Sequence, residues 1–166
     1  MRENFRDRAL VIRTYDFGEA DRIIVLLTRY HGLVRGVAKG VRRAKSRFGS
    51  RLQLFVNLDV QLYPGRNLYT ISQADTVDYF GARIIEDYDR YTAACAALES
   101  AERLAVADPG GDPYLYEACV DVLTQLQQGD PMQVLDAFLL RAMAHAGWAP
   151  SLFDCAQCQR PGPHHA

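Results

Sequence analysis

The sequence predicts an α+β protein in which a small five-stranded β-barrel is followed by a small α-helical domain. Up to about residue 80, short runs rich in Val, Ile and Leu alternate with turn residues, as in strands. Beyond Tyr79, apolar residues recur at a spacing of three to four, as in amphipathic helices. The charge divides near the same place. Residues 1–75 carry fourteen Lys and Arg against seven Asp and Glu, whereas residues 76–166 carry five against thirteen.

The five predicted strands cover residues 8–15, 22–28, 33–41, 56–63 and 68–76. The fourth has the clearest pattern, because apolar residues alternate with polar residues such as Asn57 and Asp59, which predicts one buried and one solvated face. In the third, one face carries only Val34 and small residues such as Gly36, so we expect another layer or a ligand to approach it closely. Residues 42–53 break the alternation and are predicted to form a loop or a short helix. Closing five short strands into a barrel removes their exposed edges.

Three helices are expected in the second part of the chain. The first runs from about residue 80 to a breaker sequence at 108–111. The two later helices each start at an Asp-Pro pair, with Asp112 or Asp130 as the N-cap and Pro at the first helical position, and each ends near a glycine. We expect the helices to form a bundle that packs against the barrel. The predicted division is a barrel domain at 1–80, a helical domain at 81–150 and a tail at 151–166 that begins a zinc-binding segment.

The strongest functional signal is the segment 33–51, LVRGVAKGVRRAKSRFGSR, which contains seven cations and no acidic residue. In the wider window between Asp21 and Asp59, nine cations occur without one carboxylate. A charge run by itself is most often a solvated face, but the interleaved glycines let a bulky ligand approach, and an aromatic ring can stack on a base. We therefore predict contact with nucleic acid. The predicted contact residues are Arg35, Lys39, Arg42, Arg43, Lys45, Arg47, Phe48, Arg51 and Arg66.

The tail contains a pair of cysteines, Cys155 and Cys158, separated by two residues. Two thiolates at this spacing can occupy adjacent corners of a tetrahedron, so the pair predicts the first half of a structural zinc site. His164 and His165 are the remaining candidate ligands, at a spacing that is unusual for zinc. The alternatives are a redox pair or tail cysteines without a role.

No set of residues supports enzymatic chemistry, so we expect a protein that is not an enzyme. The acidic cluster of Asp16, Glu19 and Asp21 could bind a metal or act as a base, but neither a phosphate-binding loop nor a nucleophile accompanies it. His31 lies in a predicted turn and His145 near a helix end, and both are expected at structural or solvent-facing positions.

The chain has no signal peptide and no run of about 18 apolar residues, so we expect a cytoplasmic protein. In that compartment the four cysteines are expected to be reduced thiols or metal ligands. Cys95 and Cys119 lie on the apolar stripes of their helices and are predicted to be core residues.

Several longer segments carry a family resemblance. In order, they are GEADRIIVLLTRYHGLVRGVAKGVRRAKSRFGSRLQLF, LYPGRNLYTISQADTVDYF, YDRYTAACAALESAERL, LDAFLLRAMAHAGWAP and CAQC. The most specific features are GEADRI, the HGLVRGVAKG segment and the order barrel, helices, cysteine pair. On these segments, which span nearly the whole chain, the protein resembles the RecO family of bacterial recombination mediators.

The resemblance implies an N-terminal OB-fold barrel, a helical domain and a structural zinc site. It implies a cytoplasmic, nucleoid-associated protein that binds single- and double-stranded DNA and anneals complementary strands. With RecR, such a protein helps to load the RecA recombinase onto DNA covered by single-strand-binding protein. By position, the basic segment falls on the part of the barrel expected to contact DNA, and Cys155 and Cys158 match the family's first zinc pair. The family continues past this pair, so the chain resembles a truncated form, in which we expect weak zinc binding or none.

Two other classes stay open. One is a different OB-like module, such as a transcription or RNA-binding factor without annealing activity, and an annealing assay separates it from a mediator. The other is an enzyme that uses the acidic cluster or the cysteine pair. A metal-dependent turnover of DNA that disappears in Asp21→Asn would identify that class.

Overall fold

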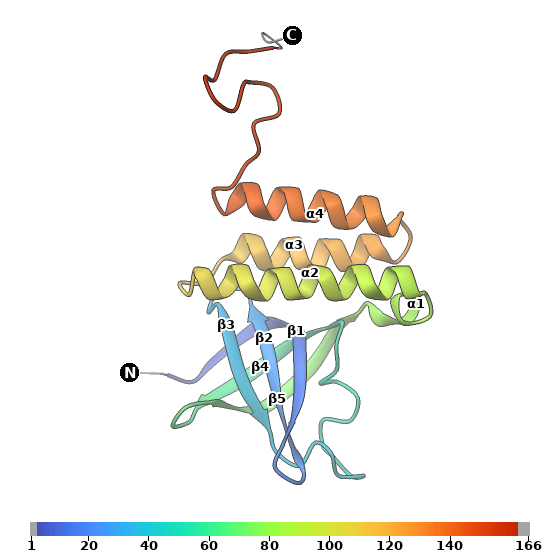
Figure 1. The fold of residues 1–166 in the computed structure, drawn as a ribbon. Helices are drawn as coiled ribbons and strands as arrows, with labels where there is room; N and C mark the ends of the chain where they lie inside the picture. Colours follow the sequence, from blue (N-terminus) through green and yellow to red (C-terminus); the bar gives the residue numbers. More distant parts are fainter. Residues whose placement is uncertain (1–2, 163–166) are drawn as a thin grey trace.

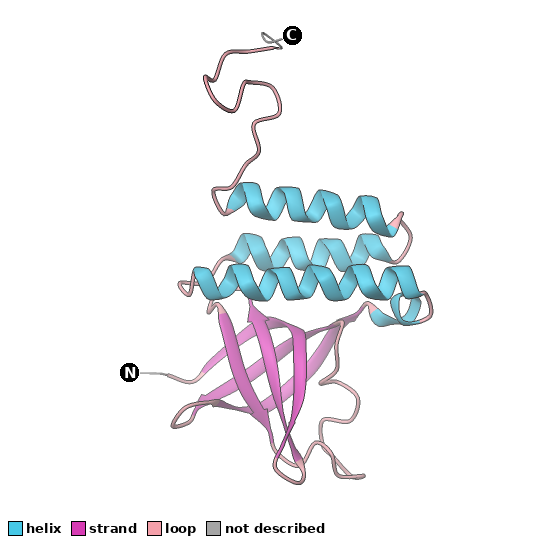
Figure 2. Ribbon diagram, in the orientation of Figure 1, coloured by secondary structure: helices cyan, strands magenta, loops and turns pink. Residues whose placement is uncertain are grey.

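The computed structural model describes residues 3–162. A β-barrel forms the lower part of the molecule, and helices lie across its upper end, with the C-terminal tail leaving from the far side of the helical layer (Figure 1). All strands precede all helices in the chain, so strands and helices form separate layers (Figure 2). The predicted α+β fold is therefore confirmed.

The barrel is built from β1 (Phe5–Phe17), β2 (Asp21–Thr28), β3 (Leu33–Ala38), β4 (Val56–Pro64) and β5 (Tyr69–Tyr79). The strand order β1-β2-β3-β5-β4 closes into a barrel because β4 pairs with β1. Neighbours are antiparallel except β3 and β5, which are parallel. This five-stranded closed arrangement is the OB-fold.

The face of β3 that carries small residues points into the barrel. Gly36 is buried, and a Cβ atom there would lie 2.8 Å from Ile71 Cγ1 and 3.3 Å from Leu62 Cδ2. The layer that approaches this face is therefore the barrel core, which leaves no space for a ligand. The strand also ends at Ala38, before the predicted residue 41, since Gly40 turns the chain with a φ of 70°.

The helical layer contains α1 (Gly81–Ile85), α2 (Tyr88–Ala107), α3 (Pro113–Leu126) and α4 (Pro131–His145). The prediction of a single first helix is wrong, because Asp87 is extended and caps α2 by accepting a hydrogen bond from the Arg90 N–H at 3.0 Å. The two Asp-Pro starts are confirmed, with the Asp112 and Asp130 side chains each accepting a backbone hydrogen bond of 3.0 Å. Among residues 3–162, none of the helices combines the length and the apolar character that a membrane span requires.

Two hydrophobic clusters hold the molecule together, and the period-two alternation of the strands divides residues between them. Val11 and Leu26 fill the barrel, whereas Leu10 and Leu27 point outward against the helices. The outer cluster also includes the fully buried Cys119, as predicted for a core cysteine. Because this cluster combines barrel and helix residues, α2 and α3 cover one part of the outer face of β1 and β2.

A buried hydrogen bond also joins the two layers. The hydroxyl of Tyr116 in α3 donates to Asn57 Oδ1 in β4 at 2.8 Å, and Asn57 donates in turn to Asp78 at 3.2 Å. Asn57 is therefore buried, contrary to the prediction that its face of β4 is solvated throughout. Burial of this amide is tolerated because its hydrogen bonds are satisfied.

Candidate nucleic-acid interface

The outer face of β1, β2 and β3 continues beyond the helices as an uncovered surface, which we call the distal face. Cross-strand pairing arranges its outward residues in rows across the three strands. The first row, Arg13, Val25 and Arg35, lies at the edge of the helices, with Val25 buried beneath them. The next rows are Tyr15, Ile23 and Val37, and then Phe17 and Asp21, with Lys39 just after the end of β3. Ile23 and Val37 are also buried, so the exposed side chains of this face come from the end of β1 and from β3. In Figure 1 the three strands run from the helices to the lower end of the barrel. Two of the predicted contact residues, Arg35 and Lys39, thus belong to one surface.

The long connection between β3 and β4, residues 39–55, is fastened to the turn between β1 and β2. The Gly40 N–H donates to the Asp21 carboxylate at 2.7 Å. The Arg42 N–H donates to the Ala20 carbonyl at 3.0 Å, and its guanidinium donates to the Gly18 carbonyl at 3.3 Å. The connection and the turn lie together at the lower end of the barrel (Figure 1). The cations at the start of the connection therefore adjoin the distal face.

Three of the nine cations between Asp21 and Asp59 form ion pairs in the fold with carboxylates from outside this window. Arg22 Nε lies 3.1 Å from one oxygen of Asp16, and Arg42 lies 3.7 Å from the other. Arg29 lies 3.0 Å from Glu117 of α3. These acidic partners stand outside the window between Asp21 and Asp59. The expectation that all nine cations are unopposed is therefore wrong for these three arginines.

Four cations in and beside the distal face remain available. Arg35, Lys39, Arg43 and Lys45 are exposed, and within the described part of the chain none of them forms an ion pair. Unpaired cations close together on a surface attract a polyanion and can release its counterions on binding.

Arg47 and Arg51 lie farther along the connection, against β5. Arg47 donates to the Ile71 carbonyl at 3.5 Å, and Arg51 donates to the Ala74 carbonyl at 3.3 Å. Together with Asp75 they line a shallow hollow of about 380 Å³. Both side chains are thus oriented by the barrel, on the flank formed by β5.

Phe48 does not have the stacking role predicted for it. Its side chain is only 2% exposed and belongs to the barrel cluster, with Leu52 in the same cluster. The Arg47 guanidinium lies 4.7 Å from the centre of its ring. The connection folds back over the barrel and uses this ring to close the core, so no base can reach it.

The exposed aromatic residues at this end of the molecule are Tyr15, at 39% exposure, and Phe17, at 47%. Sequence reasoning assigned them to a strand and a turn and gave them no role. Their alternation with Arg13 at a period of two was the available signal, since residues two apart on a strand share a face.

Arg66, the last predicted contact residue, lies in the turn between β4 and β5 and is exposed. That turn is drawn at the left of Figure 1, away from the connection of residues 39–55. The fold therefore does not bring Arg66 together with the cations of the distal face.

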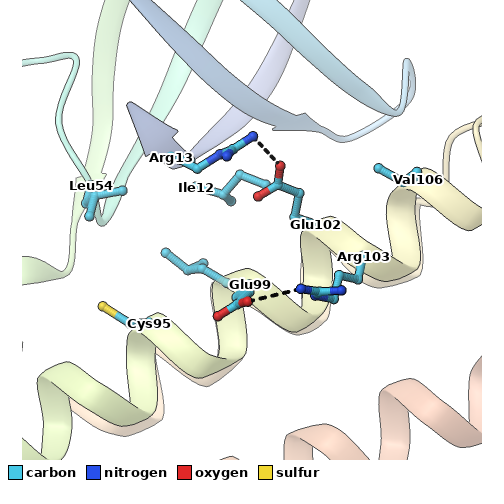
Figure 3. Close-up of a pocket in the computed structure, with 9 residues that line it drawn as sticks. Ile12, Arg13, Leu54, Cys95, Glu99, Glu102, Arg103 and Val106 are labelled. Carbon is cyan, nitrogen blue, oxygen red and sulfur yellow. Dashed lines mark hydrogen bonds and ion pairs between the residues drawn. The ribbon is translucent and has the colours of Figure 1, made fainter. Parts of the chain in front are cut away.

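A hollow of about 560 Å³ lies between β1 and α2, with an apolar lining that includes Ile12 (Figure 3). Its charged groups pair with one another. Arg13 is 2.8 Å from Glu102, and Arg103 is 3.5 Å from Glu99. Arg13 is thus directed toward α2 and is not an available cation of the distal face.

The predicted acidic cluster does not form a site. Asp16 pairs with Arg22, Asp21 accepts the Gly40 N–H, and Glu19 is exposed. Among the described residues, no group of three or more His, Cys, Asp or Glu side chains is placed to hold a metal ion.

The two described histidines occupy structural positions. His31 Nδ1 lies 2.7 Å from the buried carboxylate of Asp7, and its ring stacks on Phe5. His145 Nε2 lies 2.9 Å from Asp112, which also caps α3. Both histidines fasten turns and helix ends, in line with their predicted roles.

Cys155 and Cys158 lie in the tail that follows α4. Hydrogen bonds from the backbone N–H groups of Cys158 and Gln157 to the Cys155 sulfur lower the pKa of this thiol. The arrangement favours the thiolate, which is the form that binds metals. His164 and His165, the other candidate ligands, lie outside the described residues.

Comparison with protein families accounts for both layers. Residues 1–80 match the family model described as "Recombination protein O N terminal". Residues 85–166 match the model described as "Recombination protein O C terminal". The two matches meet where the strands give way to helices, and together they span almost the entire chain. The chain therefore belongs to the recombination protein O (RecO) family, whose domains have a mediator role in DNA repair and recombination.

Proposed function

We propose that the chain binds single- and double-stranded DNA through the distal face and the cations beside it. The observation that carries the proposal is the group of four cations in and beside the distal face that are exposed and, among the described residues, unpaired: Arg35, Lys39, Arg43 and Lys45. OB-folds bind oligonucleotides on this part of the barrel. Phosphates are common to single strands and duplexes, so binding through charge accepts both.

Annealing of complementary strands is the activity that such a surface supports. Two strands repel each other through their phosphates, and cations that neutralise this charge lower the cost of bringing them together. The strands then pair through their own bases, so the protein supplies no chemical step. We infer a mediator that anneals strands and, with RecR, assists the loading of RecA onto DNA covered by single-strand-binding protein.

The helical layer suits contacts with proteins better than contacts with DNA. Residues 76–166 carry five cations against thirteen acidic residues, so this part of the molecule repels phosphate. The asymmetry keeps DNA on the barrel and leaves the helices accessible to protein partners.

A salt-dependent binding titration tests the DNA-binding proposal. In Arg43→Ala with Lys45→Ala, the slope of log K against log salt should become shallower by about one unit for each phosphate that the protein no longer neutralises. Affinity for single strands and duplexes should fall together. The matched control is Arg83→Ala with Arg141→Ala, which removes the same charge from exposed positions on α1 and α4 that form no ion pair in the described chain.

Equal slopes in the two double variants would show that only net charge matters and would overturn the assignment to the barrel. Annealing of fluorescently labelled complementary oligonucleotides provides the second readout. Binding without any acceleration of annealing would identify a simple nucleic-acid-binding module in place of a mediator.

We also propose that Cys155 and Cys158 are two of the four ligands of a structural zinc ion. Their thiolate chemistry and spacing suit zinc, but two ligands leave the coordination sphere incomplete. We therefore expect this chain alone to hold zinc weakly. Metal analysis of protein purified without a chelator, with Cys155→Ser as the control, checks this. About one tightly held zinc per chain that disappears in the variant would contradict weak binding.

A further inference from the structure

The distal face contains aromatic side chains that charge neutralisation does not require. Tyr15 and Phe17 project from β1 on the same side of the sheet, because residues two apart on a strand share a face. Phe17 is the more open, at 47% exposure against 39% for Tyr15. Exposed rings of this size are normally covered by a partner or a ligand when they lie within a functional surface.

Three cations lie near these rings, of which Arg13 and Arg42 are ion-paired and Lys39, among the described residues, is not. Phe17 is paired with Asp21 in the last row of the distal face, and Lys39 follows at the end of β3. Arg42 is bonded to the Gly18 carbonyl, directly after Phe17. The Arg13 guanidinium lies over the Tyr15 ring, 5.5 Å from its centre. Exposed aromatic rings next to a cationic segment are the composition of a surface that binds single-stranded nucleic acid.

We propose that Phe17, with Tyr15 beside it, is a stacking platform for the unpaired bases of single-stranded DNA. The inference rests on the proposed DNA-binding function and assigns strand selectivity to a part of the same surface. Phosphate contacts at Arg35, Lys39 and the cations of the connection act on both single strands and duplexes. Stacking on Phe17 requires a free base face, which a duplex does not offer in its interior.

The spacing of the two rings supports an unstacked strand. Residues two apart on an antiparallel strand are separated by about 7 Å. Stacked bases in a DNA strand are about 3.4 Å apart. Tyr15 and Phe17 can therefore each receive a base only when the strand is extended to about twice its duplex rise, which limits the contact to single strands.

The first experiment compares Phe17→Leu, Phe17→Trp and wild type on a thymidine oligonucleotide and on a duplex of equal length. Loss of about 1 kcal/mol of stacking corresponds to roughly fivefold weaker binding. We expect Phe17→Leu to bind the single strand about fivefold more weakly with duplex affinity unchanged, and Phe17→Trp to bind at least as well as wild type. Tyr88→Leu is the control, since Tyr88 is an 80% exposed aromatic residue on α2.

The second experiment reports stacking directly through fluorescence. Trp148 is the single tryptophan of the chain, so Trp148→Phe with Phe17→Trp leaves one indole at the proposed platform. Single-stranded DNA should quench its emission strongly and duplex DNA only weakly. The same background with Tyr88→Trp should show no strong quenching by either.

Unchanged single-strand affinity in Phe17→Leu, or an unquenched indole at position 17, would overturn the platform. Equal losses of affinity for single strand and duplex, together with a lower melting temperature, would also overturn it by showing a structural role. These failures differ from failure of the proposed function, in which wild-type protein binds neither form of DNA and Arg43→Ala with Lys45→Ala changes nothing.

Discussion

The outer face of β1, β2 and β3 has two halves, both built from outward positions of these strands, and a β-bulge between Val11 and Arg13 shifts the alternation in β1 where the halves meet. Near the helices it carries Leu10, Val25 and Leu27, which are buried against α2 and α3. Beyond the helices the outward positions include Phe17 and Arg35, which are exposed. An outward orientation is common to the side chains of both halves. The element that covers each half therefore determines whether its outward residues contribute to stability or to binding.

Arg13 stands at the boundary between the two halves. Its backbone pairs with Val25 of β2, and its guanidinium donates a hydrogen bond of 2.8 Å to Glu102 of α2. The ion pair ties the helical layer to this face and removes one cation from the binding half. Substitutions in each half test whether the two are as separate as this geometry indicates.

The largest effect is expected from Leu27→Ala in the covered half. Leu27 is 2% exposed in the shared cluster, and removal of a buried leucine side chain costs about 2–4 kcal/mol. Phe17→Leu in the uncovered half should change the free energy of unfolding by less than about 0.5 kcal/mol. Urea denaturation of both variants measures the difference. Similar losses of unfolding free energy in Leu27→Ala and Phe17→Leu would contradict the distinction between a covered and an uncovered half.

The next effect concerns the buried hydrogen bond between the layers. Tyr116→Phe removes the donor to Asn57 and leaves a buried acceptor unpaired, which we expect to cost about 1–2 kcal/mol. Tyr114→Phe, at a 39% exposed position on the same helix, is the control and should be nearly neutral. Thermal unfolding of the two variants decides this. An unchanged melting temperature in Tyr116→Phe would indicate that a water molecule replaces the hydroxyl as the hydrogen-bond donor to Asn57 Oδ1.

A smaller effect distinguishes paired from unpaired cations on the same row. Arg35→Gln should reduce the salt slope of DNA binding by about one unit, because Arg35 has no ion pair in the described chain. Arg13→Gln should leave the slope nearly unchanged, since Glu102 already neutralises that charge. Titration at several salt concentrations measures both. An equal reduction of the salt slope in Arg13→Gln and Arg35→Gln would show that the Arg13–Glu102 ion pair opens when DNA binds.

The smallest effect is a pH dependence of the folding stability that arises from Asp59. This residue is the carboxylate at the C-terminal end of the cation-rich window between Asp21 and Asp59. Two hydrogen bonds of 2.8 Å from Arg6 lower the pKa of Asp59 below its ordinary value of 3.8. The ionised Asp59 therefore stabilises the fold fully at pH values above the pKa that the group has in the unfolded chain. This stabilisation is lost as the pH falls through the lower pKa that the group has in the folded protein. An NMR titration of the carboxyl group should show this pKa rising in Arg6→Gln. A value that does not move would remove Arg6 as the cause.

Prediction from the sequence worked where the local pattern and the tertiary context agree. The five strands, the two Asp-Pro helix starts and the buried Cys119 were all correct, because alternation, capping and burial of apolar stripes act over a few residues. It failed at Phe48 and Asp87. Phe48 was predicted to contact a ligand and is instead buried in the barrel core. Asp87 was predicted to lie within one long helix and instead separates α1 from α2.

The sequence by itself determined the order of strands and helices, the division of charge between barrel and helical layer, and the membership of the family. These properties depend on residue type and spacing along the chain. Only the tertiary structure decided which cations are free, since Asp16 and Glu117 lie outside the window between Asp21 and Asp59 and neutralise arginines inside it. It also decided that Phe17 is exposed and Phe48 buried, because barrel closure turns the connection inward and leaves the distal part of β1 uncovered.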